Sequence, residues 1–289
     1  MRWEGGEESD QIEDRRGFGG GRLAIGGCGT VVVVLVISLL TGANPLRVLQ
    51  LINGSASSSQ TSAPPSAGPP SQGQAPGEDQ GKKFVAVILK STEDTWSSIF
   101  EANGRRYELP TLVLFTDATP TACGEGSEAQ GPFYCPLDRK VYLDLGFFDE
   151  LSRRFGAPGD FARAYVVAHE VGHHVQQQLG IADKVSALQQ RVSPQDANQL
   201  SIRLELQADC YAGVWGNRGA RTGLVEPGDA EAGLRAASAI GDDRLQRMAT
   251  GRVQPESFTH GSSQQRVGWL KRGLESGDPG ACNTFEGVF

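Results

Sequence analysis

The chain has few of the residues from which metal and redox sites are usually built. Its 289 residues include four histidines and five cysteines, and no Cys-x-x-Cys pair occurs. The absence of that pair argues against a zinc site made of thiolates. No internal repeat is evident, and a net charge of −7 gives no reason to expect nucleic acid as a partner. The histidines and the acidic residues are therefore the candidates for metal ligands.

Three of the four histidines stand together in the run His-Glu-Val-Gly-His-His. In a helix, residues four apart lie on one face, roughly 6 Å apart along the axis. His169 and His173 can therefore share one metal ion, and Glu170 lies beside it. Two imidazoles, an open position for water and a carboxylate that takes the water's proton are the parts of a zinc hydrolase. The flanking residues are mostly apolar, so these polar groups would be buried without reason if no ligand were present.

A second motif supplies acidic residues. Glu205 and Asp209 lie one turn apart in the mostly apolar run 204–215. We predict Glu205 as the third zinc ligand and Asp209 as the acceptor for the remaining ring N–H of a ligand histidine. The opposite assignment stays open, as does a pair of solvated surface acids. The metzincin spacing is excluded, because it requires a glycine and a histidine where the chain has Gln176 and Leu179.

Three other side chains are assigned roles away from the metal. His174 points about 100° away from its neighbour around the helix, so we predict packing or hydrogen bonding for it. The tetrahedral oxyanion of a peptidase needs a donor beyond the metal. His260, in a loop-like Thr-His-Gly sequence just before a helix, is the first candidate and Tyr211 is the second. A purely structural role for His260 stays open.

Together with three further runs, these two motifs resemble the bacterial neutral zinc metallopeptidase family. The runs are 1–6, 237–246 and 257–266, so the resemblance covers the chain except for a linker. The zinc site is similar to that of gluzincin peptidases, in which a glutamate from a later helix completes the histidine pair. The resemblance implies a membrane-anchored, zinc-dependent peptidase and does not supply its substrates.

Composition divides the chain into four parts. We predict a disordered cytoplasmic tail at 1–21, a transmembrane helix at 22–43, a Ser/Pro/Gly-rich linker at 44–83 and a catalytic domain at 84–289. The uncharged stretch 23–40 is long enough to cross a hydrocarbon core of about 30 Å. A cleaved signal peptide is the alternative. Four arginines precede this stretch and one follows closely, so the positive-inside rule predicts a single-pass inner (plasma) membrane protein with an extracytoplasmic domain.

Cysteine usage agrees with that location. Cys123 and Cys135 bracket a Gly-rich segment, which leaves Cys210 and Cys282 as a second pair, while Cys28 lies in the predicted span. Four cysteines permit three pairings, so this connectivity is one of several. A domain stapled by disulfides is typical of an oxidising compartment.

The order of the expected elements indicates an α+β, zincin-like fold. A helix capped by Ser91 or Thr92 precedes strands, and four helices follow them. The strands are expected at 111–116, 133–134 and 140–145, and the helices at 159–179, 196–217, 227–247 and 262–276. Strands first and helices after suits a zincin. In that architecture a sheet edge near the active-site helix commonly binds the peptide as an added strand.

The sequence therefore predicts a zinc metalloendopeptidase that acts on peptide or protein substrates. One alternative is a membrane-tethered binding or scaffolding protein of the cell envelope with a catalytically idle zinc site. A zinc-dependent hydrolase of a non-peptide substrate is another. Glu170 favours an enzyme, because an idle site has no need of a carboxylate that does not bind the metal.

Overall fold

The computed structural model describes residues 1–17, 76–127 and 130–288, and these belong to one compact unit. The predicted transmembrane helix at 22–43, with Cys28, lies outside the described residues, as does most of the predicted linker. None of the helices in the described part of the chain combines the length and the apolar character needed to cross a bilayer.

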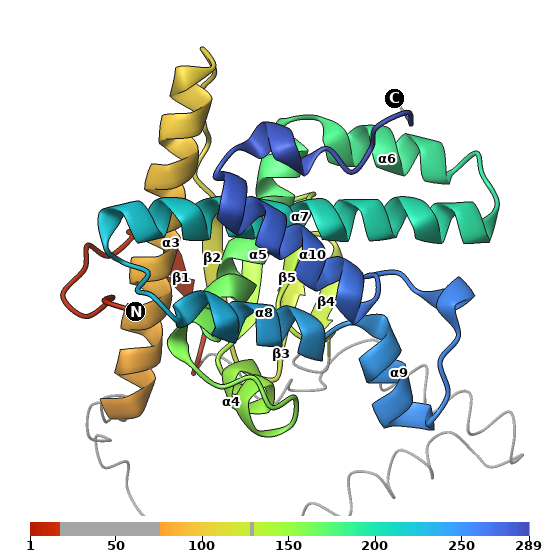
Figure 1. Ribbon diagram of the computed structural model, residues 1–289. Coiled ribbons are helices and arrows are strands. Elements are labelled where there is room, and N and C mark those ends of the chain that lie inside the picture. The colour runs from red at the N-terminus through yellow and green to blue at the C-terminus, as the bar shows by residue number, and fades with distance from the viewer. Residues whose placement is uncertain (18–75, 128–129, 289) are drawn as a thin grey trace, which may run out of the picture. The chain divides into compact units, whose positions relative to one another are not determined.

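A four-stranded sheet forms one layer of the unit, with the strand order β1-β2-β6-β5 (Figure 1). β1 (Ile12–Asp14) pairs in parallel with β2 (Thr111–Phe115), and β2 pairs in parallel with β6 (Lys140–Asp144). β5 (Phe133–Cys135) pairs antiparallel with β6 and forms one edge. Most residues of β2 and β6 are buried, as expected for central strands covered on both faces. The three predicted strands are therefore confirmed. A separate hairpin, β3 (Ala118–Thr121) and β4 (Gly124–Ser127), follows β2.

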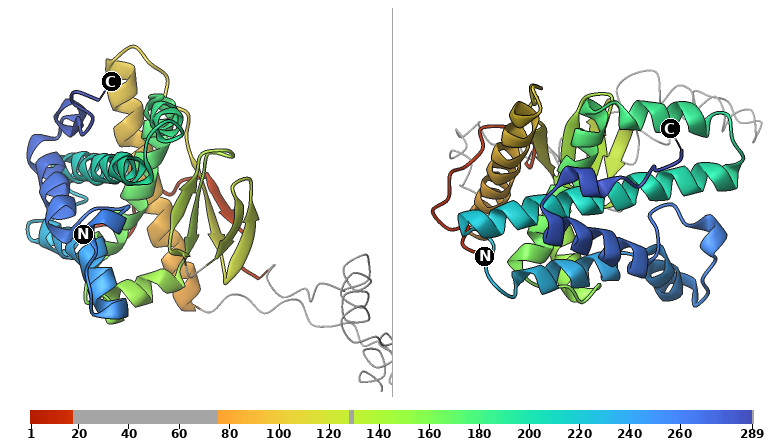
Figure 2. Two further views of the ribbon diagram at one scale, coloured as in Figure 1. Left: turned by 90° about the vertical axis from the view of Figure 1, so that its right-hand side faces the viewer. Right: turned by 45° about the horizontal axis from the view of Figure 1, so that its top comes forward.

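Helices make up most of the rest, and in the side view of Figure 2 they gather beside the sheet. Their bounds are α3 Pro76–Ala102, α4 Gly146–Arg153, α5 Asp160–Gln178, α6 Ile181–Gln189, α7 Pro194–Thr222, α8 Asp229–Ala239, α9 Asp242–Thr250 and α10 Ser263–Ser276, with the short 3-10 turns η2 Pro255–Ser257 and η3 Pro279–Cys282. The α+β class is confirmed, with helix predominating. The predicted helices at 159–179, 196–217 and 262–276 correspond to α5, α7 and α10.

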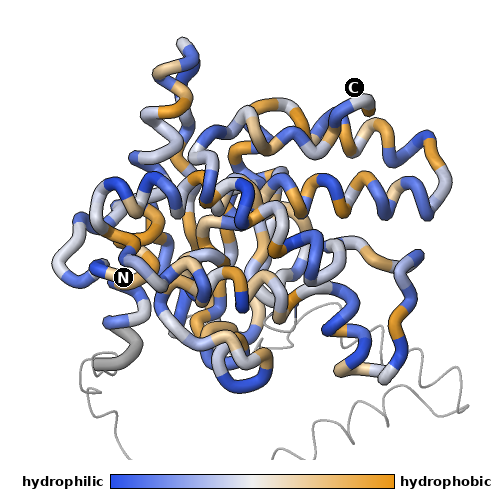
Figure 3. Tube along the Cα trace, viewed as in Figure 1, coloured by the Kyte–Doolittle hydropathy of each residue, from blue (hydrophilic) through white to orange (hydrophobic). Residues whose placement is uncertain are grey.

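The helix α5 runs through the core and is buried on nearly every face. It contacts α3, α7, α8 and the sheet, so little of its surface faces solvent, where polar residues would be favoured. The outer helices instead alternate between hydrophilic and hydrophobic residues along the chain (Figure 3). A stacked pair, Phe161 of α5 and Trp215 of α7, has ring centroids 5.8 Å apart. The polar residues of the HExxH motif are thus held in an apolar interior.

Two predicted helices have different bounds in the structure. α3 begins at Pro76, so Ser91 and Thr92 lie inside it, and the Thr92 hydroxyl donates to the Leu89 carbonyl. The apolar run before residue 91 carries no helical period, because α3 buries it on all sides. The predicted helix at 227–247 is divided into α8 and α9 at Gly241. A Cβ atom there would lie 2.3 Å from the Ser263 nitrogen, so the close approach of α10 requires glycine.

The first seventeen residues are part of the folded unit. Ser9 Oγ donates to Glu93 Oε1 at 2.6 Å in a buried contact, and the ring of Trp3 meets that of Phe84 edge-on, with centroids 5.3 Å apart. β1 then joins the sheet. The prediction of a disordered tail is wrong for residues 1–17, because their order comes from contacts with α3 and β2 that local composition does not reveal.

Both predicted disulfides are confirmed. Cys123, between β3 and β4, is bonded to Cys135 of β5, and Cys210 of α7 is bonded to Cys282 of η3. The first ties the hairpin to the edge strand. The second ties the end of the chain to the core helix α7.

Candidate metal centre

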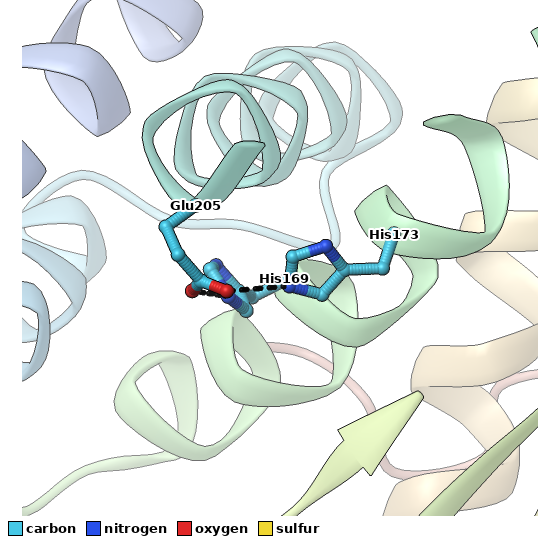
Figure 4. A group of neighbouring side chains, drawn as sticks. All are labelled: His169, His173 and Glu205. Carbon is cyan, nitrogen blue, oxygen red and sulfur yellow. Dashed lines mark hydrogen bonds and ion pairs between the residues drawn. The ribbon is translucent and has the colours of Figure 1, made fainter. Parts of the chain in front are cut away.

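Two histidines and a glutamate converge where α5 and α7 pack together (Figure 4). His169 Nε2 lies 3.2 Å from Glu205 Oε2, and His173 Nε2 lies 3.5 Å from Glu205 Oε1. One donor atom from each of the three residues lies within 4.8 Å of the other two. Two imidazole nitrogens and one carboxylate oxygen are a donor set that zinc takes in hydrolases. The residues that the sequence predicted as ligands therefore come together in a cluster that could hold a metal ion.

The close approach of the two helices depends on Gly172, which stands between the two histidines on α5. A Cβ atom at this position would lie 3.1 Å from both the Cα and the carbonyl oxygen of Ala208. Ala208 itself lies between Glu205 and Asp209 on α7. Small residues at the contact thus allow the acidic residues of α7 to reach the histidines of α5.

Each histidine ring is oriented by an acceptor on its other nitrogen. His169 Nδ1 lies 2.8 Å from Asp209 Oδ1, and His173 Nδ1 lies 2.9 Å from Gln176 Oε1. Both acceptors favour a proton on Nδ1, so Nε2 is the nitrogen of each ring that faces the cluster and is left to bind a metal. Gln176 also donates to the Leu204 carbonyl at 2.8 Å, which links it to α7. The contact of Asp209 agrees with its predicted role, whereas Gln176 had no predicted role.

A buried arginine completes the surroundings of Asp209. Arg266 of α10 is 3% exposed and Asp209 is 0% exposed. Arg266 donates from Nε to Oδ2 and from Nη2 to Oδ1, both at 2.9 Å, and the Tyr165 hydroxyl donates to the same Oδ1 at 2.5 Å. A bidentate pair of this kind compensates two buried charges that would each be costly alone. The sequence analysis assigned no role to Arg266. This arginine is nevertheless the last residue of the run 257–266, which carries part of the family resemblance.

The charges at the centre favour a cation. Burial alone would raise the pKa of Glu205, but His173 and His169 outweigh it and lower that pKa well below its ordinary range. Burial disfavours the imidazolium of His169, yet Asp209 and Glu205 raise its pKa to about 10. Burial lowers the pKa of His173. A site that stabilises a proton between carboxylates in this way also suits a divalent cation, which would replace that proton.

Glu170 lies beside the cluster and lines the same cleft as its members. It is 8% exposed, and this burial raises its pKa to about 7. A carboxylate with such a pKa accepts a proton more readily than an ordinary surface glutamate. It is not one of the three residues whose donor atoms converge, and its place next to a metal rather than on it stays a prediction.

The two candidates for an oxyanion donor differ in the structure. His260 lines the cleft and its backbone N–H donates to Asp242 Oδ2 at 2.7 Å, while its Nδ1 lies 3.2 Å from Asp242 Oδ1. The hydrogen bond with Asp242 raises the pKa of His260. Tyr211 is instead packed in the core, with its ring 5.2 Å from that of Trp96. The second candidate, Tyr211, is thus buried and is not among the residues that line the cleft.

His174 has the packing role expected from its place on the helix. It is buried, and its Nε2 lies 2.7 Å from the Glu108 carbonyl oxygen. Its Nδ1 lies 3.1 Å from the hydroxyl of Tyr134 on β5. Burial lowers its pKa, so the ring is neutral and links α5 to the edge strand.

The cleft over the cluster has a volume of about 830 Å³. The edge strand β5, the segment around α4 and the helix α9 form its walls. Much of the lining is apolar and includes Phe133, Tyr134, Phe147, Phe155, Leu245 and Met248. The cleft thus joins a polar centre to walls that suit apolar side chains.

The chain belongs to the family described as "Putative neutral zinc metallopeptidase", whose model matches residues 1–285. It is 49% identical over 293 residues to the uncharacterized protein YpfJ of Escherichia coli (strain K12), with 99% of each chain covered. It is 41% identical over 214 residues to the uncharacterized protein Mb2605 of Mycobacterium bovis, with 70% of this chain and 71% of that protein covered. No solved structure matches the chain at a significant level. The family resemblance seen in the sequence is therefore confirmed.

Proposed function

We propose that this protein is a zinc-dependent endopeptidase. The observation that carries the proposal is Glu170, a buried carboxylate in the cleft that stands next to His169 in the chain but outside the group of donor atoms. A structural zinc site is closed by four protein ligands, whereas a catalytic one has three and leaves a position for water. Three converging donors with a neighbouring base support the catalytic type.

A zinc ion bound by His169, His173 and Glu205 would lower the pKa of water toward about 7 and polarise a carbonyl group. Glu170 accepts the proton of the attacking water and then returns it to the leaving amine. His260 donates a hydrogen bond from Nε2 to the developing oxyanion, since its Nδ1 is engaged by Asp242.

The cleft supports a peptide substrate that carries apolar side chains. The strand β5 is one edge of the sheet and lines the same cleft as Glu170, so a peptide can bind there as an added strand. Apolar side chains of such a peptide would meet Phe147, Phe155 and Leu245, which line the cleft. The open ends of a strand-like mode fit cleavage inside a chain, which is the reason for proposing an endopeptidase.

The comparison that tests the proposal is wild type against Glu170→Gln. The amide keeps the volume of the side chain but removes the base, so zinc stays bound while proton abstraction fails. Loss of a general base commonly costs about 10²- to 10⁴-fold in rate. Zinc content and cleavage of a diverse peptide library are measured in parallel on the full chain, with a chelator-treated sample.

A matched control is Glu275→Gln on the exposed outer side of α10, which should leave both readouts unchanged. Equal cleavage by wild type and Glu170→Gln would contradict the proposed mechanism. A wild-type protein that holds stoichiometric zinc and cuts no peptide in the library would instead favour the binding or scaffolding alternative.

A further inference from the structure

The segment 1–17 contributes the strand β1 to the four-stranded sheet of the folded unit. The strand β1 pairs with β2 in the register Ile12↔Leu112 to Asp14↔Leu114. The Leu112 N–H donates to the Gln11 carbonyl at 2.8 Å, and the Arg15 N–H donates to the Leu114 carbonyl at 2.8 Å. Such main-chain bonds satisfy the edge of β2, a strand whose residues are almost wholly buried.

Further contacts hold the same segment against three other elements. Trp3 Nε1 donates to Asp160 Oδ2 on α5 at 3.0 Å, and Lys140 Nζ of β6 donates to Glu13 Oε2 at 2.6 Å. Gly6 lies so close to α3 that a Cβ atom on it would be 2.7 Å from Val87 Cγ1. Contacts with α5, β6 and α3 at once show that residues 1–17 pack as an integral part of the unit.

We infer that residues 1–17 and 76–288 lie on the same side of any membrane that the chain enters. A chain that crosses a bilayer an odd number of times between two points leaves those points on opposite sides. The strands β1 and β2 cannot pair through a bilayer, and β1 lies before the apolar stretch 23–40 while β2 lies after it. The folded unit is therefore incompatible with a single crossing between its two parts.

The single-pass topology that the arginine distribution predicts does not fit this arrangement of the strands. A cytoplasmic amino terminus and an extracytoplasmic domain cannot both hold in the folded protein. The two disulfides favour an oxidising compartment for the domain, so we place the segment 1–17 outside the cytoplasm together with it.

Cysteine labelling on the full chain tests the inference. In a Cys28→Ser background, which leaves only the four disulfide-bonded cysteines, a single cysteine replaces either Glu8 or Glu275, both exposed. Spheroplasts that express each variant are treated with a membrane-impermeant maleimide, with and without detergent. We expect both positions to react in intact spheroplasts. Reaction of one position in intact spheroplasts and of the other only after detergent would overturn the inference.

A zero-length carbodiimide cross-link gives an independent readout that needs no new cysteine. In isolated membranes, wild type should form a link between Glu13 and Lys140, found by mass spectrometry, and Lys140→Arg should lose it because the guanidinium keeps the charge but not the reactive amine. The pair Lys90 and Asp94 on α3 is the internal positive control. A sample that forms the α3 link and no Glu13–Lys140 link would show that β1 does not pair with the sheet in the membrane-bound protein.

Discussion

Asp209 is the residue at which the three helices of the metal centre meet. It lies on α7, orients His169 of α5 and pairs with Arg266 of α10. Burial alone would raise the pKa of Asp209, but Arg266 and His169 outweigh it and lower that pKa. The aspartate is therefore charged inside the protein, and its charge supports both the orientation of the ligand histidine and the attraction of a cation.

At this scale, the assignment of Glu205 as ligand predicts that Glu205→Ala weakens zinc binding more than Asp209→Ala. Loss of a residue that only orients a ligand typically costs 10- to 100-fold in affinity, roughly. Zinc affinity is measured by competition with a chelator. A larger loss in Asp209→Ala would mean that the two acidic residues have the opposite roles.

Asp209→Ala has a second effect that must be separated from the first. It leaves the buried Arg266 without its carboxylate partner, although hydrogen bonds to Tyr165 and Ile240 remain, and loss of one partner of a buried ion pair costs about 3–5 kcal/mol of stability. The double variant Asp209→Ala with Arg266→Met removes both charges and should recover much of the free energy of unfolding but not the zinc affinity. Recovery of both would show that Asp209 acts through stability alone.

The pKa of Glu170 predicts an acid limb in the pH profile of peptide cleavage. Burial raises this pKa to about 7, and only the deprotonated carboxylate can accept a proton from water. The rate constant kcat/KM should therefore fall as the pH drops through the pKa, by about tenfold per pH unit for a single proton. Bound zinc lowers the pKa, so the midpoint should lie at 7 or below. A profile that stays flat through and below the ordinary glutamate range would remove Glu170 as the base.

At the scale of elements, the crossing of α7 and α10 determines where Arg266 lies. The two helices touch through glycines, and a Cβ atom on Gly273 would lie 2.0 Å from the Cys210 carbonyl oxygen. The backbones therefore approach more closely than any larger side chain permits. This contact brings Arg266, two turns earlier on α10, against Asp209.

We predict that Gly273→Ala destabilises the protein, while Gly268→Ala on the same helix does not. Overpacking typically costs about 1–3 kcal/mol and more when backbone must move. A Cβ atom on Gly268 meets nothing within 4 Å, so this variant should gain up to about 1 kcal/mol from the higher helix propensity of alanine. Denaturant unfolding of both variants checks the pair. Equal stability of the two would contradict the close packing of α7 and α10.

At the scale of the whole molecule, two disulfides restrain different parts of the fold. The pair Cys210–Cys282 joins positions 72 residues apart, and the pair Cys123–Cys135 joins positions 12 residues apart. Loop-closure entropy predicts stabilisation of about 4 kcal/mol for the first and about 3 kcal/mol for the second. The shorter one also holds β5, the edge strand beside the cleft.

We therefore expect removal of one disulfide to change mainly the free energy of unfolding and removal of the other to change KM. Cys210→Ser with Cys282→Ser should lower the free energy of unfolding by more than Cys123→Ser with Cys135→Ser. The second double variant should instead raise KM for peptides, because β5 loses a restraint at the proposed binding edge. Unfolding curves and steady-state kinetics on the same samples decide this. An unchanged KM would exclude β5 as the edge that binds the peptide.

Local patterns predicted the parts of the protein that depend on spacing within one helix. His169 and His173 are four apart, and Glu205 and Asp209 are four apart, so each pair shares a face of its helix before any packing is known. The central strands could also be predicted, since continuous apolar runs between turn residues are typical of buried strands. Both kinds of feature depend on the local sequence within one helix or strand.

Only the tertiary structure decided which distant residues meet. Nothing in the spacing of the chain shows that Arg266 reaches Asp209, that Asp242 holds His260, or that the charged, glycine-rich segment 1–17 adds a strand to a sheet formed a hundred residues later. Each of these contacts gains its stability from burial and main-chain pairing with partners far along the sequence. The amino-acid sequence by itself thus determined the candidate ligand types and their helices, whereas packing decided the network behind them and the place of the amino-terminal segment.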